Sequence, residues 1–402
     1  METKNNKLFL GGISAEKLIK EYGSPLYVYE EETIRERYSG MVENIRHKNL
    51  RIYYACKANA NIEILKLLRR LGAGIETVSV GEVAAALKAG FKPSQMMFTC
   101  DNVPDDELRF LIRKKIAVNI DSLSQLEKYG ELNPGSSVGL RINQGIGGGE
   151  HSHIITGGPE SKFGIHHTQI DDARKIAAKH DISVVGLHQH IGSGVLDASL
   201  FIKAMNVLLS TAHVFQKLEY LNFGGGFGVA YRPEEKPLDL KQLGRKISDE
   251  FERFCRAYGS EPLMIFEPGK YIVSESGVLL ATVIDIKKNP ERTFVGVDSG
   301  FNHLIRPAFY GSYHRIVNAS SVSGRRVTAT LAGNICESGD VFSKDREMTA
   351  CKEGDVIALL NAGAYGYSMS SNYNLRLKPA EVLVGKNKAR VIRKRERIEN
   401  IL

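Results

Sequence analysis

Residues 51–59 read RIYYACKAN, an apolar and β-prone run that ends on a lysine. A helical pattern follows at once, because apolar side chains recur at Ile64, Leu67 and Leu68. A strand followed directly by a helix is the repeating unit of α/β folds, which place their chemistry at the carboxyl ends of the strands. A lysine held there among apolar neighbours loses hydration, so its pKa should fall and its neutral amine could form a Schiff base. The competing interpretation of Lys57 is a surface lysine that happens to end a strand.

The same alternation of strand and helix continues from residue 32 to residue 270. The strand-like runs cover residues 51–56, 75–78, 96–99, 117–120, 137–142, 184–189, 220–223 and 263–267. Helix-like segments separate most of them, at 61–71, 82–89, 105–114, 122–129, 168–180, 198–217 and 239–258. This pattern predicts an α/β fold, a (β/α)8 TIM-like barrel, with a doubly wound open sheet as the alternative.

The rest of the chain is rich in β-prone segments without intervening helices. They lie at 278–286, 293–298, 327–332, 355–360 and 381–392, with two N-terminal pieces at 7–10 and 26–29. A helix from Ser14 to Tyr22, ended by Gly23, is expected between the N-terminal pieces. Because a closed barrel has no free sheet edge, these pieces should join the C-terminal strands. We therefore predict a barrel domain over 32–270 and a β-rich domain over 1–31 and 271–402.

Composition favours a globular protein over membrane-spanning, secreted and nucleic-acid-binding proteins. The 402 residues are 43% hydrophobic and 25% charged, an ordinary globular balance. No apolar run approaches the roughly 20 residues of a membrane span, and the N-terminus has no secretory pattern. Five scattered cysteines without a Cys-x-x-Cys pair argue against disulfides and structural zinc, and for a reducing, cytoplasmic location. The net charge of +8 is spread out, apart from residues 390–397, which we interpret as a solvated helix face, so we do not expect nucleic-acid binding.

Three of the predicted barrel strands end in residues that can carry chemistry. Strand six runs into LHQHIGSG at 187–194, where His188 and His190 point the same way and could serve as acid/base groups, metal ligands or a stacking surface. Strand seven runs into NFGGGFG at 222–228, and glycines let backbone amides approach an anion, although a flexible turn looks the same. Strand eight runs into FEPGK at 266–270, where Glu267 could also form a barrel-mouth salt bridge.

Together with YACKAN at 54–59, these stretches resemble the pyridoxal-phosphate decarboxylases with an alanine-racemase-type barrel. The resemblance implies that Lys57 holds pyridoxal 5'-phosphate, His190 stacks on its ring and Ser193 binds its phosphate. Glu267 would keep the ring nitrogen protonated, which makes the ring a strong electron sink for decarboxylation. The full cofactor set implied by the resemblance is Lys57, Glu76, Arg141, His190, Ser193, Gly225, Gly226, Glu267, Gly269, Lys270 and Tyr365.

Two members of this set need comment. By the resemblance, Arg141 lies under the cofactor, and Glu76 takes the place of an acidic group that orients the stacked histidine. The family pattern Glu-Pro-Gly-Arg is altered here, because Lys270 replaces the arginine. Lysine keeps the charge but lacks the two-pronged grip of arginine on phosphate or on a substrate carboxylate.

The β-rich region holds three further stretches: VDSGFNHLIRPAFYG at 297–311, GNICESGD at 333–340 and NAGAYGYSM at 361–369. In this order they closely resemble the diaminopimelate decarboxylase family. The resemblance implies that Arg306 and Tyr310 bind substrate carboxylate, Cys336 donates a proton, Glu337 binds the substrate amine and Tyr365 lies by the cofactor and substrate. The Cys-Glu-Ser loop would come from a second subunit, which implies a homodimer with shared active sites.

The resemblance is strongest to the enterobacterial-type branch, on residues 141–147, 156–165 and 365–374. It implies decarboxylation of meso-2,6-diaminopimelate to L-lysine and carbon dioxide, the last step of lysine biosynthesis. The alternative enzyme is a related decarboxylase that acts on carboxynorspermidine, ornithine, arginine or a carrier-bound glutamyl group. A non-catalytic relative is a third hypothesis, and the presence of both Lys57 and Cys336 counts against it.

Overall fold

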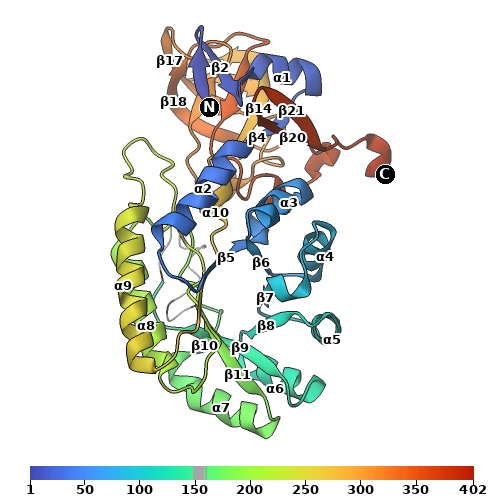
Figure 1. Ribbon diagram of the computed structural model, residues 1–402. Helices are drawn as coiled ribbons and strands as arrows, with labels where there is room; N and C mark the ends of the chain where they lie inside the picture. The colour runs from blue at the N-terminus through green and yellow to red at the C-terminus, as the bar shows by residue number, and fades with distance from the viewer. Residues whose placement is uncertain (148–157, 159–160) are drawn as a thin grey trace. The chain divides into compact units, whose positions relative to one another are not determined.

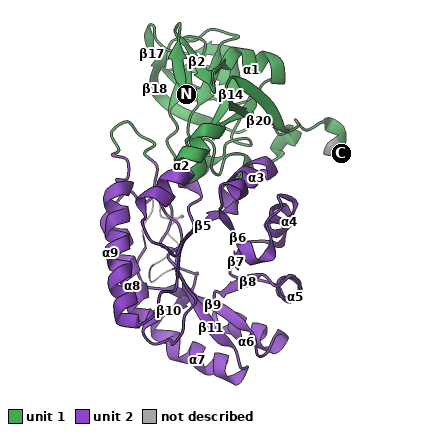
Figure 2. Cartoon of the chain, in the orientation of Figure 1, with its two compact units in different colours: residues 1–36, 230–235, 272–402 green, residues 37–229, 236–271 purple. Residues whose placement is uncertain are grey.

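The computed structural model describes residues 1–147, 158 and 161–402 (Figure 1). Its chain divides into two compact units (Figure 2). Unit 1 comprises residues 1–36, 230–235 and 272–402, and unit 2 comprises residues 37–229 and 236–271. The short segment 230–235 therefore belongs to unit 1, although its neighbours in the sequence belong to unit 2.

Unit 2 is a parallel β-barrel. Within the described residues, the barrel strands are β5 (Leu50–Ala55), β6 (Gly74–Thr77), β7 (Met96–Thr99), β8 (Ala117–Ile120), β9 (Ser137–Asn143), β11 (Ser183–His188), β12 (Tyr220–Asn222) and β13 (Leu263–Phe266). They pair in parallel in this order, and the β13–β5 pairing closes the ring. The short β10 (Ile165–His166) adds to the carboxyl end of β9. The predicted barrel is confirmed, and the open-sheet alternative is excluded.

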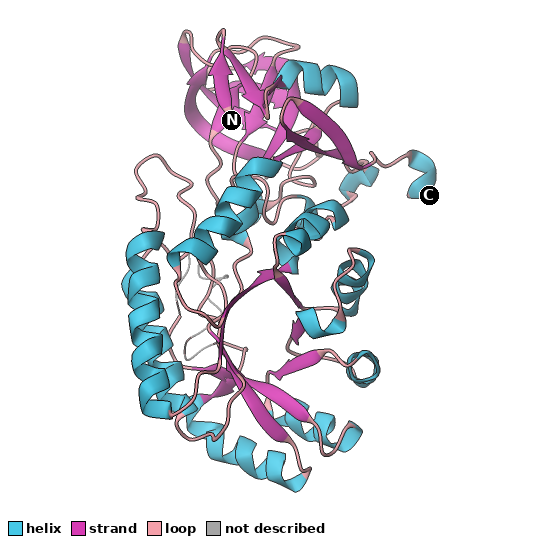
Figure 3. Ribbon diagram, in the orientation of Figure 1, coloured by secondary structure: helices cyan, strands magenta, loops and turns pink. Residues whose placement is uncertain are grey.

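Helices alternate with the barrel strands and lie around them (Figure 3). Their bounds are α2 (Glu31–Asn44), α3 (Ile62–Arg70), α4 (Val80–Lys88), α5 (Asp105–Lys114), α6 (Leu123–Leu132), α7 (Ile170–Lys179), α8 (Ala198–Ala212), α9 (Leu240–Tyr258) and α10 (Lys270–Val273). Several of these helices begin soon after the preceding strand, at a residue whose side chain caps the helix N-terminus. Ser79 and Ser122, for example, accept hydrogen bonds from backbone amides of α4 and α6. These early starts keep the loops at the carboxyl ends of β6 and β8 short.

Unit 1 is built on a mixed sheet. Its members are β4 (Leu26–Glu30), β14 (Gly277–Lys288), β15 (Thr293–Val297), β16 (Ile316–Asn318), β17 (Arg326–Ala332), β18 (Val341–Thr349), β19 (Val356–Leu359), β20 (Ala380–Gly385) and β21 (Lys388–Arg393). The N-terminal strand β4 lies between β14 and β20, so the expectation that it joins the C-terminal strands is confirmed. Strands β1 (Glu2–Lys4), β2 (Lys7–Leu10) and β3 (Ile13–Ser14) form a small antiparallel sheet before α1 (Ala15–Tyr22). The helix expected there is present, and Ser14 caps it, because the Ser14 hydroxyl accepts a hydrogen bond from the amide of Lys17.

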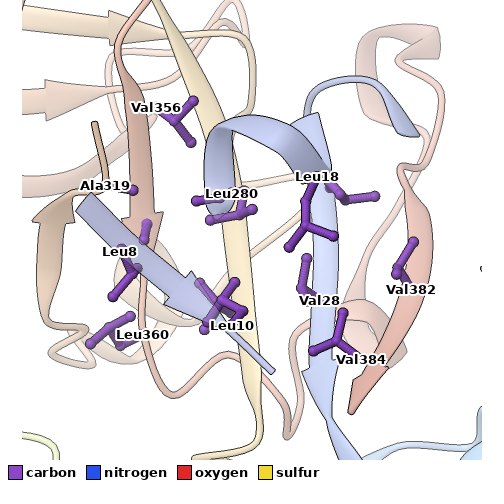
Figure 4. Close-up of a cluster of buried hydrophobic side chains, with 14 of the residues drawn as sticks. Leu8, Leu10, Leu18, Val28, Leu280, Ala319, Val356, Leu360, Val382 and Val384 are labelled. Atoms are coloured by element: carbon purple, nitrogen blue, oxygen red, sulfur yellow. The ribbon is translucent and has the colours of Figure 1, made fainter. Parts of the chain in front are cut away.

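The core of unit 1 is aliphatic. Its buried side chains come from β2, α1, β4, β14, β19 and β20 and from the residues just after β16 and β19, which converge in Figure 4. The labelled members are Leu8, Leu10, Leu18, Val28, Leu280, Ala319, Val356, Leu360, Val382 and Val384. N-terminal and C-terminal segments thus share one core, which explains why the chain folds back on its first residues.

One expectation about the C-terminal segment is wrong. Residues 390–397, interpreted as a helix face, begin inside β21, which pairs antiparallel with β20. The turn residues Lys386 and Asn387 both have positive φ and close the hairpin, so the single run expected at 381–392 is two strands. The basic side chains suit an exposed edge strand, where charge discourages pairing with another chain.

In the part of the chain that the structure describes, no helix is both long and apolar enough to cross a bilayer.

Candidate active site

Lys57 lies at the carboxyl end of β5, in a single turn of 3₁₀ helix, Cys56–Ala58. This turn packs closely on Gly269, where an added Cβ would meet the Cβ atoms of Ala58 and Ala55 at 3.0 and 3.1 Å. The close approach explains why the residue at position 269, two after Glu267, is a glycine. The Lys57 side chain remains about one-third exposed, with its Nζ 3.8 Å from Oε2 of Glu76.

Glu76 lies in β6, one residue before its end, and is fully buried beside Lys57. Burial raises the pKa of Glu76 to about 8, although the charge of Lys57 acts in the opposite direction. Its Oε2 has no hydrogen-bond partner among the described residues. Burial therefore favours the protonated form of Glu76, whose carboxyl lies next to the lysine amine.

His190 follows β11 and is held by the glycine run after β12. Its Nδ1 accepts a hydrogen bond from the backbone N–H of Gly225 at 3.1 Å, which leaves the ring proton on Nε2. Desolvation and the nearby charges of Lys57 and Arg141 keep the pKa of His190 well below its usual range. The imidazole is thus neutral and fixed in orientation.

The glycine run brings three strand ends together. A Cβ on Gly225 would lie 2.3 Å from the backbone oxygen of Glu267, and one on Gly224 would lie 2.1 Å from that of Gln189. The backbone of Val195, just after Ser193, also pairs with Gly226 and Gly228 through hydrogen bonds of 2.9 Å. The loops after β11 and β12 are therefore joined, and Ser193 lies in this joined region.

Glu267 follows β13 and is buried as an anion. Its Oε2 lies 3.0 Å from Nε2 of His188, and its Oε1 accepts from Nδ2 of Asn222 at 2.6 Å. Burial alone would raise the pKa of Glu267, but His188, Lys57 and Asn222 outweigh it and hold the pKa below its usual value. A negative charge is thus maintained inside the barrel mouth.

Two further cations of unit 2 are buried. Arg141 lies in β9, two residues before its end. Its Nη1 is 2.9 Å from Oδ1 of Asp121, and its guanidinium lies over the ring of Phe163, 4.5 Å from the ring centroid. Lys270 is 4% exposed and begins α10. Neither Asp121 nor Phe163 was expected from the sequence, because their importance depends on which strands neighbour β9.

In unit 1, Arg306 begins α11 (Arg306–Tyr310) and is 2% exposed. Its guanidinium lies over the rings of Tyr231, Tyr310 and Tyr365, with centroids 5.5, 5.8 and 5.9 Å away. Tyr365 has φ +57°, a costly conformation for a bulky residue and one that often marks a functional position. Tyr231 was not predicted, because its segment lies among barrel residues in the sequence; its position just after the glycine run was the one available hint.

Cys336 and Glu337 lie on an exposed loop of unit 1. The amide of Cys336 donates to Oδ1 of Asn374 at 2.9 Å, and the hydroxyl of Tyr373 donates to Glu337 at 2.5 Å. Leu375, next to Asn374, is 59% exposed and has φ +53°, which is strained for leucine. The Cys336 loop and the contacting segment Tyr373–Leu375 thus present a thiol, a carboxylate and apolar side chains at the surface of this unit.

The residues of the barrel mouth fit pyridoxal phosphate. They provide an amine, a flat neutral ring and a buried carboxylate, and Glu76 Oε2 is a buried oxygen in need of a partner. His188 and His190, which were considered as metal ligands, have separate partners. His188 contacts Glu267, and His190 accepts a hydrogen bond from the backbone of Gly225. Among the described residues no group of His, Cys, Asp and Glu side chains could hold a metal ion. Part of the stretch 156–165, namely Thr156, Gly157, Pro159 and Glu160, lies outside the described residues.

Comparisons with known proteins agree with this chemistry. Residues 31–274 match the family model described as "Pyridoxal-dependent decarboxylase, pyridoxal binding domain". Diaminopimelate decarboxylase of Methanothermobacter thermautotrophicus is 43% identical over 98% of this chain and 94% of its own length. The Escherichia coli K12 enzyme of the same name is 37% identical over 97% and 96%. A crystal structure of the M. jannaschii diaminopimelate decarboxylase with L-lysine has a TM-score of 0.91, with 34% identity over 100% and 96% of the two chains.

Proposed function

The chain belongs to the family of pyridoxal-dependent decarboxylases and decarboxylates diaminopimelate to lysine, and on that premise we propose how its residues divide the work. The observation that carries the proposal is the convergence of an amine, a neutral imidazole and an ionised carboxylate at the ends of β5, β11 and β13. These are the groups that a pyridoxal enzyme needs for decarboxylation.

Bound pyridoxal phosphate supplies an electron sink for the electron pair that the departing carbon dioxide leaves behind. Lys57 would hold the cofactor through its Nζ. Glu267 would hold a proton at the ring nitrogen, and His190 would offer its flat face to the ring. Glu76, protonated beside Lys57, exchanges a proton with the amine and, as the resemblance implies, helps to orient His190.

The phosphate is held where the two loops join. Ser193 supplies a hydroxyl for the phosphate, and Gly226 supplies a backbone N–H. Gly225 acts indirectly, because its N–H donates to His190 and holds that ring in place. Gly269 keeps the Lys57 turn close to β13. Arg141, oriented by Asp121, would lie under the cofactor, and Lys270 would add a positive charge for phosphate or for substrate carboxylate.

The distal end of meso-diaminopimelate carries an amino-acid group that simple diamine precursors lack. Arg306 and Tyr310 bind its carboxylate, Tyr365 lies by cofactor and substrate, and Glu337 binds the amine. The burial of Arg306 among tyrosine rings supports this assignment, because a desolvated guanidinium binds a carboxylate strongly. This reading of the distal end favours diaminopimelate over ornithine, arginine or carboxynorspermidine.

The chain forms a homodimer in which Cys336 enters the active site of the partner and donates a proton to the substrate carbon. The exposure of Cys336, Tyr373 and Leu375 supports a covering surface formed by the Cys336 loop and the segment Tyr373–Leu375.

Three finer assignments complete the proposal. The chain groups with the enterobacterial-type branch, supported by residues 365–374. Its identity to the M. thermautotrophicus enzyme, 43%, is nevertheless higher than its identity to the E. coli enzyme, 37%. It acts in the cytoplasm, supported by cysteines that are all free thiols. The cofactor-binding domain is assigned to residues 32–270 and the β-rich domain to 1–31 and 271–402, bounds that differ from the two compact units at residues 32–36, 230–235 and 271.

The test combines cofactor and product. Purified protein should be yellow, should release lysine from meso-diaminopimelate, and after borohydride reduction should carry the cofactor on Lys57 alone. Ornithine, arginine and carboxynorspermidine serve as competing substrates under the same conditions. A label on another lysine would refute the Lys57 assignment, and faster turnover of a competing substrate would refute the reading of the distal end.

A further inference from the structure

Glu267 is shared by two buried side chains from the neighbouring strands. His188, the last residue of β11, and Asn222, the last residue of β12, each contact a different carboxylate oxygen, at 3.0 and 2.6 Å. The three side chains are 2%, 0% and 4% exposed for His188, Asn222 and Glu267. Water therefore cannot replace either contact.

The barrel register fixes both contacts. His188 is paired with Asn222 between β11 and β12, and Asn222 with Ile265 between β12 and β13, two residues before Glu267. The Oδ1 atom of Asn222 accepts from the N–H of Gly224 at 2.9 Å, so its amide must direct Nδ2, the donor, at Glu267. Both partners therefore present N–H groups to the carboxylate, whichever state of charge His188 has.

We propose that His188 and Asn222 are positioning residues that hold Glu267 as an oriented anion, so that the proton of the cofactor stays on its ring nitrogen. The inference rests on the proposed role of Glu267 toward pyridoxal phosphate. A carboxylate offers about four lone-pair sites, so two remain for the ring N–H after these contacts. Donors to the ionised form favour it over the acid, and the lowered pKa of Glu267 agrees with this arrangement.

The alternative is that His188 only fills space in the barrel. Under that view, an apolar ring of similar size would serve equally well. Under our inference, loss of one buried donor makes Glu267 more basic by about tenfold or more, because a hydrogen bond to a charged group is worth at least this factor. The proton would then move toward Glu267, and the electron sink would weaken.

The experiment uses holoenzyme loaded with pyridoxal phosphate that carries nitrogen-15 in its ring. Nuclear magnetic resonance reports the protonation of that nitrogen independently of turnover. In His188→Phe we expect the signal to move toward the unprotonated position and kcat to fall about tenfold or more, with a smaller change in KM. His188→Gln, which can keep an N–H donor, should restore much of both.

Asn222→Asp provides a second variant, because it replaces a donor with a carboxylate and should shift the signal in the same direction. Thr99→Val is the matched control, since it removes a buried barrel hydrogen bond to Asn119 that does not involve Glu267. An unchanged ring signal in folded His188→Phe and Asn222→Asp, with wild-type protein active, overturns the inference. Wild-type protein that binds no cofactor would instead refute the proposed function.

Discussion

At the scale of single residues, the proton on Glu76 links stability to pH. Burial raises the pKa of Glu76 to about 8 in the folded chain, against roughly 4.3 for an unfolded glutamate. Because the folded value is the higher one, the stability that this proton contributes is fully present below about pH 4 and is lost as pH rises through about 8. Glu76→Gln cannot lose the proton, so the cofactor-free variant should keep a higher Tm than wild type above roughly pH 8.

Thermal unfolding measured over a pH series checks this expectation. Glu252→Gln is the control, because Glu252 lies on α9 with its side chain 55% exposed, and its Tm should follow that of wild type. Equal pH dependence in wild type and Glu76→Gln would contradict the assignment of a buried proton to Glu76.

Tyr231 should affect substrate binding through Arg306, although it was not expected to lie there. A cation–π contact is worth about 0.5–2 kcal/mol, so Tyr231→Leu should raise KM for diaminopimelate about two- to thirtyfold and change kcat less. Tyr313→Leu is the control, because its ring contacts Arg232 and Arg346 but carries no assigned role in the site. A KM that rises equally in both variants would indicate a general loss of packing.

Lys270, the departure from the family pattern, should tolerate arginine. Arginine can grip an anion with two hydrogen bonds, each worth roughly 1.5–3 kcal/mol when charged, so Lys270→Arg should bind substrate or cofactor about tenfold tighter. Lys270→Ala should weaken both. Titrations with meso-diaminopimelate and with pyridoxal phosphate measure these affinities. Because Lys270 is buried, an arginine variant as weak as the alanine variant would show that the pocket is shaped for lysine.

The site residues that could be predicted from the sequence are those that directly follow a strand-like run. Lys57, His190 and Glu267 could be proposed as site residues because they follow apolar runs that end at the barrel mouth. The contact of His188 with Glu267 joins residues 79 positions apart, and it depends on the register of β11, β12 and β13. Tyr231 depends on segment 230–235 joining unit 1, and no local pattern encodes that choice.

At the scale of elements, the glycine run after β12 is a spacer between strand ends. In Gly225→Ala, the new methyl would lie 2.3 Å from the backbone oxygen of Glu267, so one of the two segments must shift. We expect kcat to fall about tenfold to a hundredfold and cofactor affinity to fall as well, since small displacements in a site are costly. Steady-state kinetics and a cofactor titration measure both effects.

Gly40→Ala adds the same methyl in α2, where nothing lies within 4 Å. This control should be fully active and more stable by roughly 0.5–1 kcal/mol, because glycine is unfavourable inside a helix. If Gly225→Ala were equally benign, the run would be an ordinary flexible turn.

The barrel strands were predictable as elements because strands covered by helices are continuous apolar runs. The edge of the sheet in unit 1 was not. Strand β21 reads KARVIR, so half of its residues are basic, and it lies at that edge. Its basic residues therefore resemble those of a solvated helix face. Only the positive φ of Lys386 and Asn387 marks the turn that makes it the second strand of a hairpin, and neither residue is a glycine.

At the scale of the whole molecule, the proposed dimer predicts complementation. Lys57→Ala and Cys336→Ala subunits should each be inactive, because one lacks the cofactor amine and the other the proton donor. If each site combines Lys57 of one chain with Cys336 of its partner, a mixed dimer has one intact site. Random exchange makes half of all dimers mixed, so the mixture should regain about a quarter of wild-type activity.

The reciprocal mixture separates a shared site from other causes of recovery. When wild type is mixed with the double variant Lys57→Ala/Cys336→Ala, every site of a mixed dimer lacks one of the two groups, so activity per wild-type chain should fall by about half. A site contained in one chain predicts no recovery in the first mixture and no loss in the second. Cys351→Ala is the control, because this half-buried thiol contacts the backbone of Thr349 and should leave each mixture unchanged. Native mass spectrometry of subunits with different tags must first show that mixed dimers form. If they form and the first mixture regains no activity, the shared site is refuted.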